Sequence, residues 1–551
     1  MNRRDFLKLT GTAFMLGSLG APLTRAKSVY GADNSQGCVV FLSDGLRLDR
    51  TGVGGGHATP FFDTFAALNT VYPHAYSPDT WTAPSHWSMF TGYRNFQSSM
   101  AQPPSSHWRE IGNIPSLAQI LGGFGIKTIL AADNSFLQPG TKGEGKLTTG
   151  YELVDNMWSD FPLKKMVIER TKTGQTKNLT LSPFFQEYSN DHQILKELPK
   201  DSLRRIKDIT SVEGYNQGKE LPPHDQKALT RYVKMRYEPT INSLIQCAKE
   251  KRPFFLFVNI HVPCKTILWP ETTRWFSEYF KTNFKIDLTE EELSFCRNAH
   301  YMFRHEISNG FYNLLVDYFS YLQDGIISTL YDILKQNSII TGNTMVAYTS
   351  DHGVMYGEHE KEYGVPREAH YFVLPFDELI HIPLTIRHPK IKEKRLLATV
   401  NTTRLFHTVI DYFDPPGKNI FMRGGEASLA DINPQAMAWN FTESFTSPQT
   451  AKELEIFLKN KTDAAAAYVS VSKPGGMKLV WGLGNQTSFL FGPPPNETLI
   501  DNEQSRRTLL SLCQKYFGDK YGLTLEGHEL VSEKPHWPNE QLETLKSLGY
   551  L

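Results

Sequence analysis

Cysteine is scarce in this chain and is spread too widely to form a metal-binding cluster. The 551 residues contain five cysteines, at positions 38, 247, 264, 296 and 513, and no Cys-x-x-Cys pair. Zinc ribbons need such closely spaced pairs, so we do not expect this class of site. The odd count leaves at least one thiol unpaired, the sequence does not pair the others, and we expect most of them to be buried apolar residues.

Neither basic nor acidic residues are in surplus in this chain. The chain has 58 Lys and Arg residues and 58 Asp and Glu residues, which gives a formal net charge of zero at pH 7. Proteins that bind nucleic acid usually carry a basic surplus, and solvating disordered segments are often strongly acidic. A hydrophobic content of 40% is ordinary for a protein with a large core. We therefore expect a folded protein with no nucleic-acid partner.

An apolar run long enough to cross a membrane is also missing, and no membrane span is predicted. The N-terminus instead has the organisation of an export signal. Arg3 and Arg4 precede Phe-Leu-Lys, residues 9–19 are moderately apolar, and small residues stand at Thr24 and Ala26. This order predicts a twin-arginine signal peptide over residues 1–26 and a periplasmic or extracellular location. The alternative is a soluble N-terminal helix.

Two apolar runs end in side chains that are suited to bind a metal ion. Residues 39–43 and 344–349 have the composition of buried parallel strands, and they lead to Asp44 and to Asp351-His352. Because open α/β sheets bind ligands at the carboxyl ends of their strands, we expect these side chains to meet. Together with a hydroxyl they would bind one divalent ion, with Ca²⁺, Mg²⁺, Mn²⁺ and Zn²⁺ all compatible. Taken singly, each pattern is also typical of an ordinary turn.

Thr82 begins a third segment whose side chains are candidates for a role in catalysis. Residues 82–92 have the sequence Thr-Ala-Pro-Ser-His-Trp-Ser-Met-Phe-Thr-Gly. The segment resembles the nucleophile loop of the sulfatase family, with its Pro-Ser frame and Thr-Gly ending. Threonine stands where that family keeps a cysteine or serine, and none of the five cysteines lies in the loop. Considered alone, Thr82 is also consistent with an ordinary loop hydroxyl.

Further segments resemble the sulfatase family in the same order along the chain. Residues 44–49 resemble its opening Asp-x-Leu-Arg-x-Asp, and residues 350–353 with 357–359 resemble its Asp-His-Gly and Gly-Glu-His pair. Residues 381–384 resemble its Arg-Val-Pro-Leu strand, and residues 545–551 resemble a common ending. The chain is therefore similar, over most of its length, to sulfatase-type members of the alkaline phosphatase superfamily.

The resemblance implies a three-layer α/β/α sandwich of the alkaline phosphatase type with a smaller C-terminal α+β subdomain. We expect a catalytic domain over residues 38–394 and the subdomain over 395–551, where residues 477–481 have the pattern of an edge strand. The polar residues of about 140–250 indicate an insertion. It either covers the mouth of the active site or is a solvated excursion with no catalytic role. Apolar residues at helical spacing predict a long helix over residues 314–334.

The departures from the family pattern decide the predicted chemistry. Threonine cannot be oxidised to the formylglycine of that family, so we expect no formylglycine and instead a metal-bound Thr82 nucleophile. The predicted metal ligands are Asp44, Thr82, Asp351 and His352. Three histidines are further catalytic candidates, with a structural histidine as the alternative for each. His261 and His370 would protonate the leaving group, and His86 would orient Thr82 or contact the substrate.

These residues predict a hydrolase of sulfate or of phosphate and phosphonate esters. A threonine ester must be cleaved at its central atom, which phosphorus tolerates, whereas the overall resemblance favours sulfate. One alternative is a transferase that moves a phospho-alcohol group to a lipid or glycan. Another is a non-catalytic binding protein on a decayed sulfatase scaffold, against which the joint presence of the four ligands argues. The sequence does not predict an oligomeric state.

Overall fold

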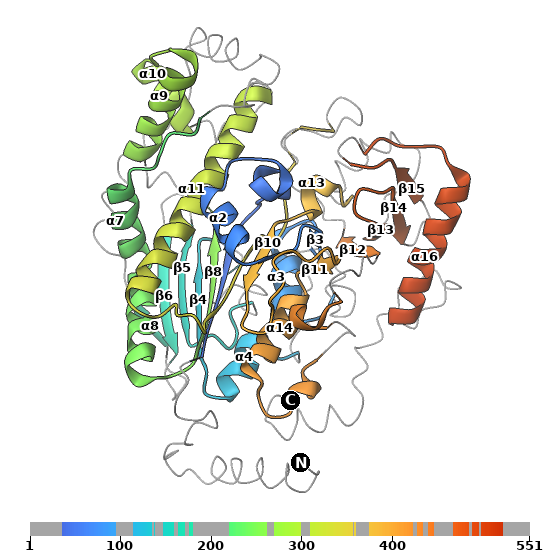
Figure 1. Cartoon of the computed structure of the whole chain (residues 1–551), viewed down its shortest axis with the longest axis horizontal. Helices are drawn as coiled ribbons and strands as arrows, with labels where there is room; N and C mark the ends of the chain where they lie inside the picture. The colour runs from blue at the N-terminus through green and yellow to red at the C-terminus, as the bar shows by residue number, and fades with distance from the viewer. Residues whose placement is uncertain are drawn as a thin grey trace, which may run out of the picture.

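A nine-stranded mixed sheet with helices on both faces forms the centre of the molecule (Figure 1). The computed structural model describes residues 36–94, 114–134, 137, 147–158, 164–170, 176–179, 220–261, 269–298, 309–355, 357–359, 374–422, 427–433, 439–445, 467–483, 488–494 and 497–521. The strands of the sheet are β1 Gly37–Ser43, β2 Thr70–Val71, β4 Lys127–Ala132, β5 Leu153–Trp158, β6 Lys164–Arg170, β7 Thr176–Leu179, β8 Phe254–Ile260, β9 Met345–Thr349 and β10 Leu384–Arg387. Their order is β2-β10-β9-β1-β8-β4-β5-β6-β7.

The central strands β9, β1, β8, β4 and β5 are parallel, and their register brings their carboxyl ends together. Ser43 lies opposite Ile260, and Leu42 lies opposite Thr349. Every residue of β1, β8 and β9 is buried, which explains why these strands appear in the sequence as continuous apolar runs. The residues that follow these strands therefore emerge at one end of the sheet.

Helices cover both faces of the sheet and confirm the predicted three-layer architecture. One layer contains α2 Pro60–Leu68, α7 Gln226–Arg236, α8 Glu238–Glu250, α9 Trp269–Phe284, α10 Glu290–Asn298 and α11 Asn309–Gln336. The other contains α3 Thr82–Thr91, α4 Leu117–Gly123 and α14 Arg404–Phe413. Val39 and Phe41 of β1 pack in the core between the sheet and the α11 layer, and Val40 and Leu42 pack in the core between the sheet and the layer of α3, α4 and α14. The predicted helix over 314–334 lies inside α11.

The C-terminal region contains a separate antiparallel sheet with one long helix (Figure 1). Its elements are β12 Asn440–Phe445, β13 Ala467–Ser472, β14 Lys478–Leu483, β15 Ser488–Phe491 and α16 Glu503–Tyr521. The strand order is β12-β13-β14-β15, so the prediction of an edge strand at 477–481 is wrong. Leu479 and Trp481 pack under α16, whereas Val480 faces the catalytic region, so β14 is buried on both faces. Two smaller elements, β3 Ala75–Tyr76 and α13 Asp377–Ile380, pack against this sheet, and β11 Val400–Asn401 pairs with β3.

The segment predicted as an insertion contributes to the central sheet and to one helical layer. Within about 140–250, strand β5 extends the sheet in parallel to β4, and β6 and β7 add antiparallel strands at its edge. Helices α7 and α8 pack in the same layer as α11. The described residues of this segment are thus joined to the central sheet by backbone hydrogen bonds and to the α11 layer by apolar packing.

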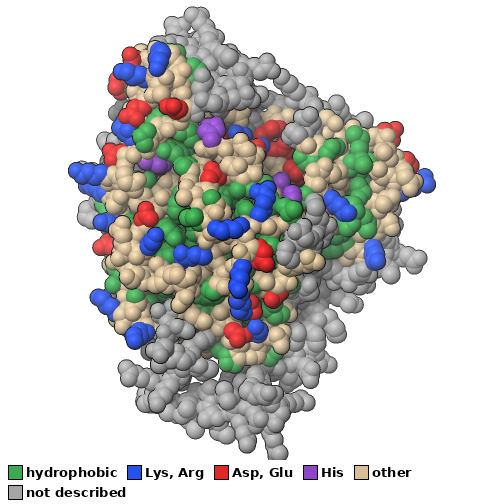
Figure 2. All heavy atoms as spheres, viewed as in Figure 1, with side chains coloured by type: hydrophobic (Ala, Val, Ile, Leu, Met, Phe, Trp, Pro, Cys, Tyr) green, Lys and Arg blue, Asp and Glu red, His purple; other side chains and the backbone are tan. Residues whose placement is uncertain are grey.

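The described cysteines and the surface charge agree with the expectations from composition. Among the described residues, Cys38, Cys247 and Cys513 are buried free thiols and Cys296 is also buried, whereas Cys264 and residues 1–26 lie outside the described part. No described helix has both the length and the apolar character needed to cross a membrane. Figure 2 shows basic and acidic side chains interspersed over the described part of the viewed face, as the balanced composition leads one to expect.

Asp324 joins α11 to α2 through a buried carboxyl group. Its oxygens accept the backbone N–H groups of Phe61 and Phe62 at 2.7 and 2.9 Å, at the first turn of α2. The Tyr348 hydroxyl donates to the same carboxyl group at 3.1 Å. These bonds assign Asp324 to packing and helix capping. Burial raises the pKa of Asp324 to about 7.

The raised pKa of Asp324 predicts a pH-dependent stability. A carboxyl group with a higher pKa in the folded than in the unfolded chain takes up a proton on folding, so the free energy of unfolding falls as pH rises. This fall occurs between about pH 4 and pH 7, at up to about 1.4 kcal/mol per pH unit. Asp324→Asn removes this group's contribution. Chemical denaturation should therefore show the variant gaining stability relative to wild type as pH rises through this range.

The exposed Asp332, on the same helix, provides the control Asp332→Asn. Its stability difference from wild type should stay nearly constant with pH. A constant difference for Asp324→Asn as well would contradict the assignment.

Candidate active site

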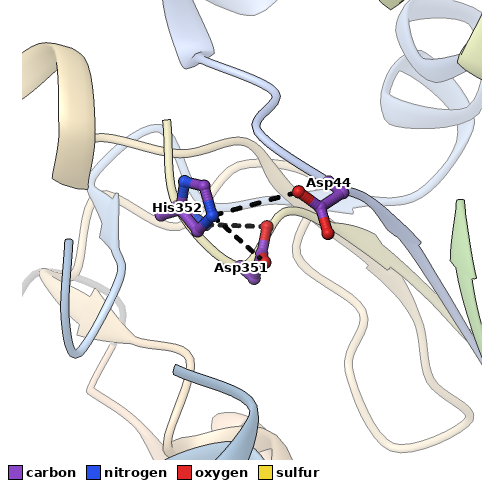
Figure 3. Close-up of side chains that lie close together, drawn as sticks. All are labelled: Asp44, Asp351 and His352. Carbon is purple, nitrogen blue, oxygen red and sulfur yellow. Dashed lines mark hydrogen bonds and ion pairs between the residues drawn. The ribbon is translucent and has the colours of Figure 1, made fainter. Parts of the chain in front are cut away.

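Three side chains from two strand ends converge in one buried cluster (Figure 3). Asp44 directly follows β1, and Asp351 and His352 lie just beyond β9. One potential ligand atom from each residue lies within 4.8 Å of the other two. All three side chains are buried. The structure thus brings together the three residues that were expected to meet because they follow the carboxyl ends of neighbouring strands.

Thr82 is the first residue of α3, and its hydroxyl faces this cluster. Thr82 Oγ1 lies 3.0 Å from His352 Nε2. The preceding Trp81 has extended backbone angles, φ −154° and ψ 170°, so the helix begins at Thr82. The first turn of a helix presents unpaired N–H groups and partial positive charge. This position favours ionisation of the hydroxyl and the approach of an anionic group.

His352 presents one ring nitrogen to the cluster because the other is engaged. Nδ1 lies 2.6 Å from the Gly353 carbonyl oxygen, to which it donates. In the neutral ring, Nε2 then carries a lone pair. Nε2 lies 3.4 Å from Asp351 Oδ2 and 3.9 Å from Asp44 Oδ1. A backbone carbonyl on the second nitrogen is the usual support of a metal-ligating histidine.

The Asp44 carboxylate is oriented by two amides. Asn134 and Asn259 donate through Nδ2 to Asp44 Oδ2, at 2.8 and 3.2 Å. Oδ1 is left facing the cluster, 3.2 Å from His261 Nδ1. Although burial raises the pKa of Asp44, the imidazoles of His261, His352 and His86 outweigh it and hold this pKa below its ordinary value. Asp44 is therefore suited to remain ionised.

Asp351 has one satisfied oxygen and one that lacks a hydrogen-bond donor. Its Oδ1 accepts the backbone N–H groups of Gly45 and His352 at 3.2 and 3.0 Å. Its Oδ2 is buried and has no hydrogen-bond partner within the described part of the chain. Burial and the charge of Asp44 raise the pKa of Asp351. Two carboxylate oxygens, an imidazole lone pair and a hydroxyl thus converge, and this donor set fits a divalent cation.

The predicted catalytic histidines differ in their access to the site. His261 follows β8, and 21% of its side chain is exposed beside Asp44. His86 is fully buried in α3, where Nδ1 donates to the Thr82 carbonyl oxygen at 2.9 Å and Nε2 accepts from Asn259 at 3.2 Å. His86 is thereby placed to orient the first turn of α3 from within the core. His370 lies outside the described residues.

The loops that carry the site are tied together by Arg47. Its guanidinium binds Asp49 at 2.6 Å, binds Glu358, and donates to the Val354 carbonyl oxygen at 3.2 Å. Arg47 follows β1, whereas Val354 and Glu358 follow β9. The arginine therefore braces the Asp44 loop against the Asp351 loop.

A second group of buried ligand-type side chains lies nearby and is balanced by lysine. His359, Glu378 and Glu497 have ligand atoms within 4.8 Å of one another. Lys478 Nζ lies 2.6 Å from both Glu497 Oε1 and Asp377 Oδ1. Because this ammonium already supplies the positive charge, the group forms a structural ion-pair network between α13 and β14. It offers a poorer cation site than the Asp44 cluster.

Sequence reasoning missed the two asparagines that orient Asp44. Asn259 interrupts the apolar run of β8, and a polar residue inside a buried strand was the available signal. Asn134 follows β4 by two residues, where the local sequence has no such mark.

Comparisons with known proteins agree with this fold. The family model described as Sulfatase matches residues 36–415. A phosphonate monoester hydrolase from Silicibacter pomeroyi has a TM-score of 0.53 at 14% identity, covering 90% of this chain and 96% of its own. A 2-O GAG sulfatase has a TM-score of 0.51 at 14% identity, covering 92% and 98%. A protein solved with its substrate D-glucosamine-2-N,6-O-disulfate has a TM-score of 0.53 at 12% identity, covering 90% and 100%. No curated protein matches the sequence.

Asp44 and Asp351 are two buried carboxylates that lie close together, so Asp351→Asn is predicted to stabilise the metal-depleted protein. In metal-depleted protein, the substitution removes one of two buried like charges and keeps an oxygen for Gly45 and His352. We expect the free energy of unfolding to rise by about 1–3 kcal/mol. The same variant should lose the stabilisation that wild type gains from a divalent ion. Thermal denaturation with a chelator, and then with Ca²⁺, Mg²⁺, Mn²⁺ or Zn²⁺, measures both effects.

Asp411→Asn is the matched control. Asp411 lies 3.1 Å from Lys390 Nζ and 2.9 Å from Lys418 Nζ, so its charge is compensated. This substitution should not stabilise the protein and should preserve the response to metal. A full metal response in Asp351→Asn would show that the cluster is not the binding site.

Proposed function

The chain belongs to the sulfatase family, and we propose that it is an exported, metal-dependent ester hydrolase whose nucleophile is Thr82. The observation that carries this proposal is the position of Thr82 Oγ1, 3.0 Å from His352 Nε2 in the cluster of Asp44 and Asp351. An isolated threonine hydroxyl is a weak nucleophile at neutral pH. Here it lies at a helix N-terminus among side chains that suit a divalent ion.

The proposed ligands are Asp44, Thr82, Asp351 and His352. A divalent ion held by them would lower the pKa of the Thr82 hydroxyl and offset the negative charge of the ester group. His86 holds the Thr82 carbonyl oxygen at 2.9 Å and so maintains the geometry of the first turn. Asn134 and Asn259 keep Asp44 Oδ1 directed to the site.

The proposed reaction has two displacements at the central atom of the ester. Thr82 Oγ1, having lost its proton to solvent, attacks phosphorus as an alkoxide, and the bond between phosphorus and the leaving oxygen breaks. His261 donates a proton to that oxygen, and its partial exposure beside Asp44 allows it to do so. Water then attacks the same phosphorus and gives a proton to His261. The bond between phosphorus and Thr82 Oγ1 breaks, which releases the acid and restores the Thr82 alkoxide.

Phosphate or phosphonate esters are the substrate class that this nucleophile favours. Formylglycine forms a sulfated intermediate that can break at carbon, whereas a threonine ester can be released only by displacement at phosphorus or sulfur. Displacement at phosphorus is the more tractable of the two when positive charge is nearby. Sulfate esters are the second candidate, because the chain belongs to a family named for that activity.

Replacement of Thr82 tests the nucleophile. Thr82→Ala should lower kcat/KM by at least about 10³-fold, because the covalent step is lost. Thr82→Ser should retain measurable activity, because it keeps the oxygen. The assay uses p-nitrophenyl phosphate, a phosphodiester, a phosphonate ester and a sulfate ester with each divalent ion, and we expect the phosphorus esters to react faster.

The control is Thr91→Ala at the other end of the same helix, where the hydroxyl donates to the Trp87 carbonyl oxygen. It should leave the rate largely intact. Wild-type rates in Thr82→Ala would eliminate the covalent route.

Export is tested through the paired arginines. Replacing Arg3 and Arg4 by lysine should leave the full chain in the cytoplasmic fraction, because the twin-arginine pair is read by the export machinery. Wild-type chain should reach the periplasm and lose residues 1–26. An unchanged periplasmic fraction for the double lysine variant would rule out this export route.

A further inference from the structure

Arg236 is a completely buried cation at the end of α7. Its Nε lies 2.8 Å from Asp133 Oδ1, and its Nη1 lies 2.8 Å from Asp155 Oδ1. Its Nη2 donates to the Ala132 carbonyl oxygen at 2.7 Å. One guanidinium therefore holds the carboxyl end of β4 and the neighbouring strand β5.

The two carboxylates bound by Arg236 are fixed by further donors. The Tyr237 hydroxyl lies 3.2 Å from Asp133 Oδ2, and Thr240 Oγ1 lies 3.0 Å from Asp155 Oδ2. Both donors belong to the α7–α8 segment. Because each carboxylate is bonded on both oxygens, the network has little freedom to rearrange. Arginine suits this place because its planar fork reaches two carboxylates and a carbonyl at once.

Asn134 connects this network to the active site. It directly follows Asp133, and its Nδ2 donates to Asp44 Oδ2 at 2.8 Å. Its own carbonyl oxygen accepts from Asn156 Nδ2 at 2.9 Å. The backbone on either side of Asn134 is thus anchored while its side chain holds Asp44. A shift of Asp133 would displace the amide that sets the direction of the Asp44 carboxylate.

We propose that Arg236 is a positioning residue of the active site, acting through Asn134 on Asp44. The proposal rests on the proposed role of Asp44 as a metal ligand. The α7 segment, which the sequence predicted to lie in an insertion, would then help to position the active site. The buried arginine fixes the end of β4, so that Asp44 Oδ2 stays on Asn134 and Oδ1 stays on the metal side. Loss of such outer contacts typically weakens metal binding 10- to 100-fold.

The test uses the full chain with Arg236→Lys, Asn134→Ala and the double variant. Lysine keeps the charge but cannot make the three-way contact. The dissociation constant for Mn²⁺ and for Zn²⁺ is measured by competition with a chromophoric chelator, well below the unfolding temperature of each variant. Each single variant should raise the constant about 10-fold or more. The double variant should bind the metal no more weakly than the single variant that binds it more weakly, because Arg236 acts through Asn134.

Arg252→Lys is the matched control at the opposite end of the same strands. Arg252 Nη1 lies 3.1 Å from Glu152 Oε2, and its Nε donates to the Gly125 carbonyl oxygen at 3.0 Å. Its replacement should leave metal affinity unchanged even where it lowers the melting temperature. Should Arg236→Lys fail to fold, Asp133→Asn weakens the same contact while it preserves the shape of the side chain.

Amide hydrogen exchange in the metal-free protein separates this proposal from the proposed function. Arg236→Lys should increase exchange in the peptide over residues 129–134, whereas Arg252→Lys should not. Wild-type metal affinity in folded Arg236→Lys, or effects that multiply in the double variant, would overturn the proposal. A wild-type protein that binds no divalent ion would contradict the proposed function, and the exchange result would then decide the role of Arg236 alone.

Discussion

The convergence of two buried carboxylates on one imidazole nitrogen is the constraint around which this structure is organised. Asp44 and Asp351 face His352 Nε2 at 3.9 and 3.4 Å, and Asp351 Oδ2 has no hydrogen-bond donor among the described residues. Such an arrangement is unfavourable unless positive charge lies between the groups. The parallel register of β1 and β9 nevertheless brings them together.

Support for these groups comes from every layer of the molecule. From the α11 layer, Gln323 donates to the Asp44 carbonyl oxygen at 3.2 Å and also binds Ser43. From the C-terminal sheet, the Glu443 N–H lies 3.3 Å from the Pro78 carbonyl oxygen, in the segment that leads to Thr82. Lys478 of β14 binds Asp377 of α13, and the Leu379 carbonyl oxygen of the same helix accepts the Gly353 N–H beside His352 at 2.7 Å. The subdomain and both helical layers therefore hold one small site in shape.

The sequence predicted the parts of this arrangement that have local causes. Continuous apolar runs identified β1 and β9, and the strand-end rule then grouped Asp44 with Asp351 and His352. Partners that meet only in three dimensions carry no such mark. Arg236 lies about a hundred residues beyond Asp133 in the chain, in a polar stretch whose composition suggested an insertion. The edge position expected for 477–481 was wrong, because a short apolar run does not reveal that β15 follows and pairs with it.

Anomalous scattering from crystals grown with Mn²⁺ or Zn²⁺ tests the central claim most directly, since it locates the ion without relying on turnover. The account predicts one strong peak in contact with Asp44 Oδ1, Thr82 Oγ1, Asp351 Oδ2 and His352 Nε2. An ordered site with no peak among these four atoms, or an ion bound while the Thr82 hydroxyl points elsewhere, would contradict it.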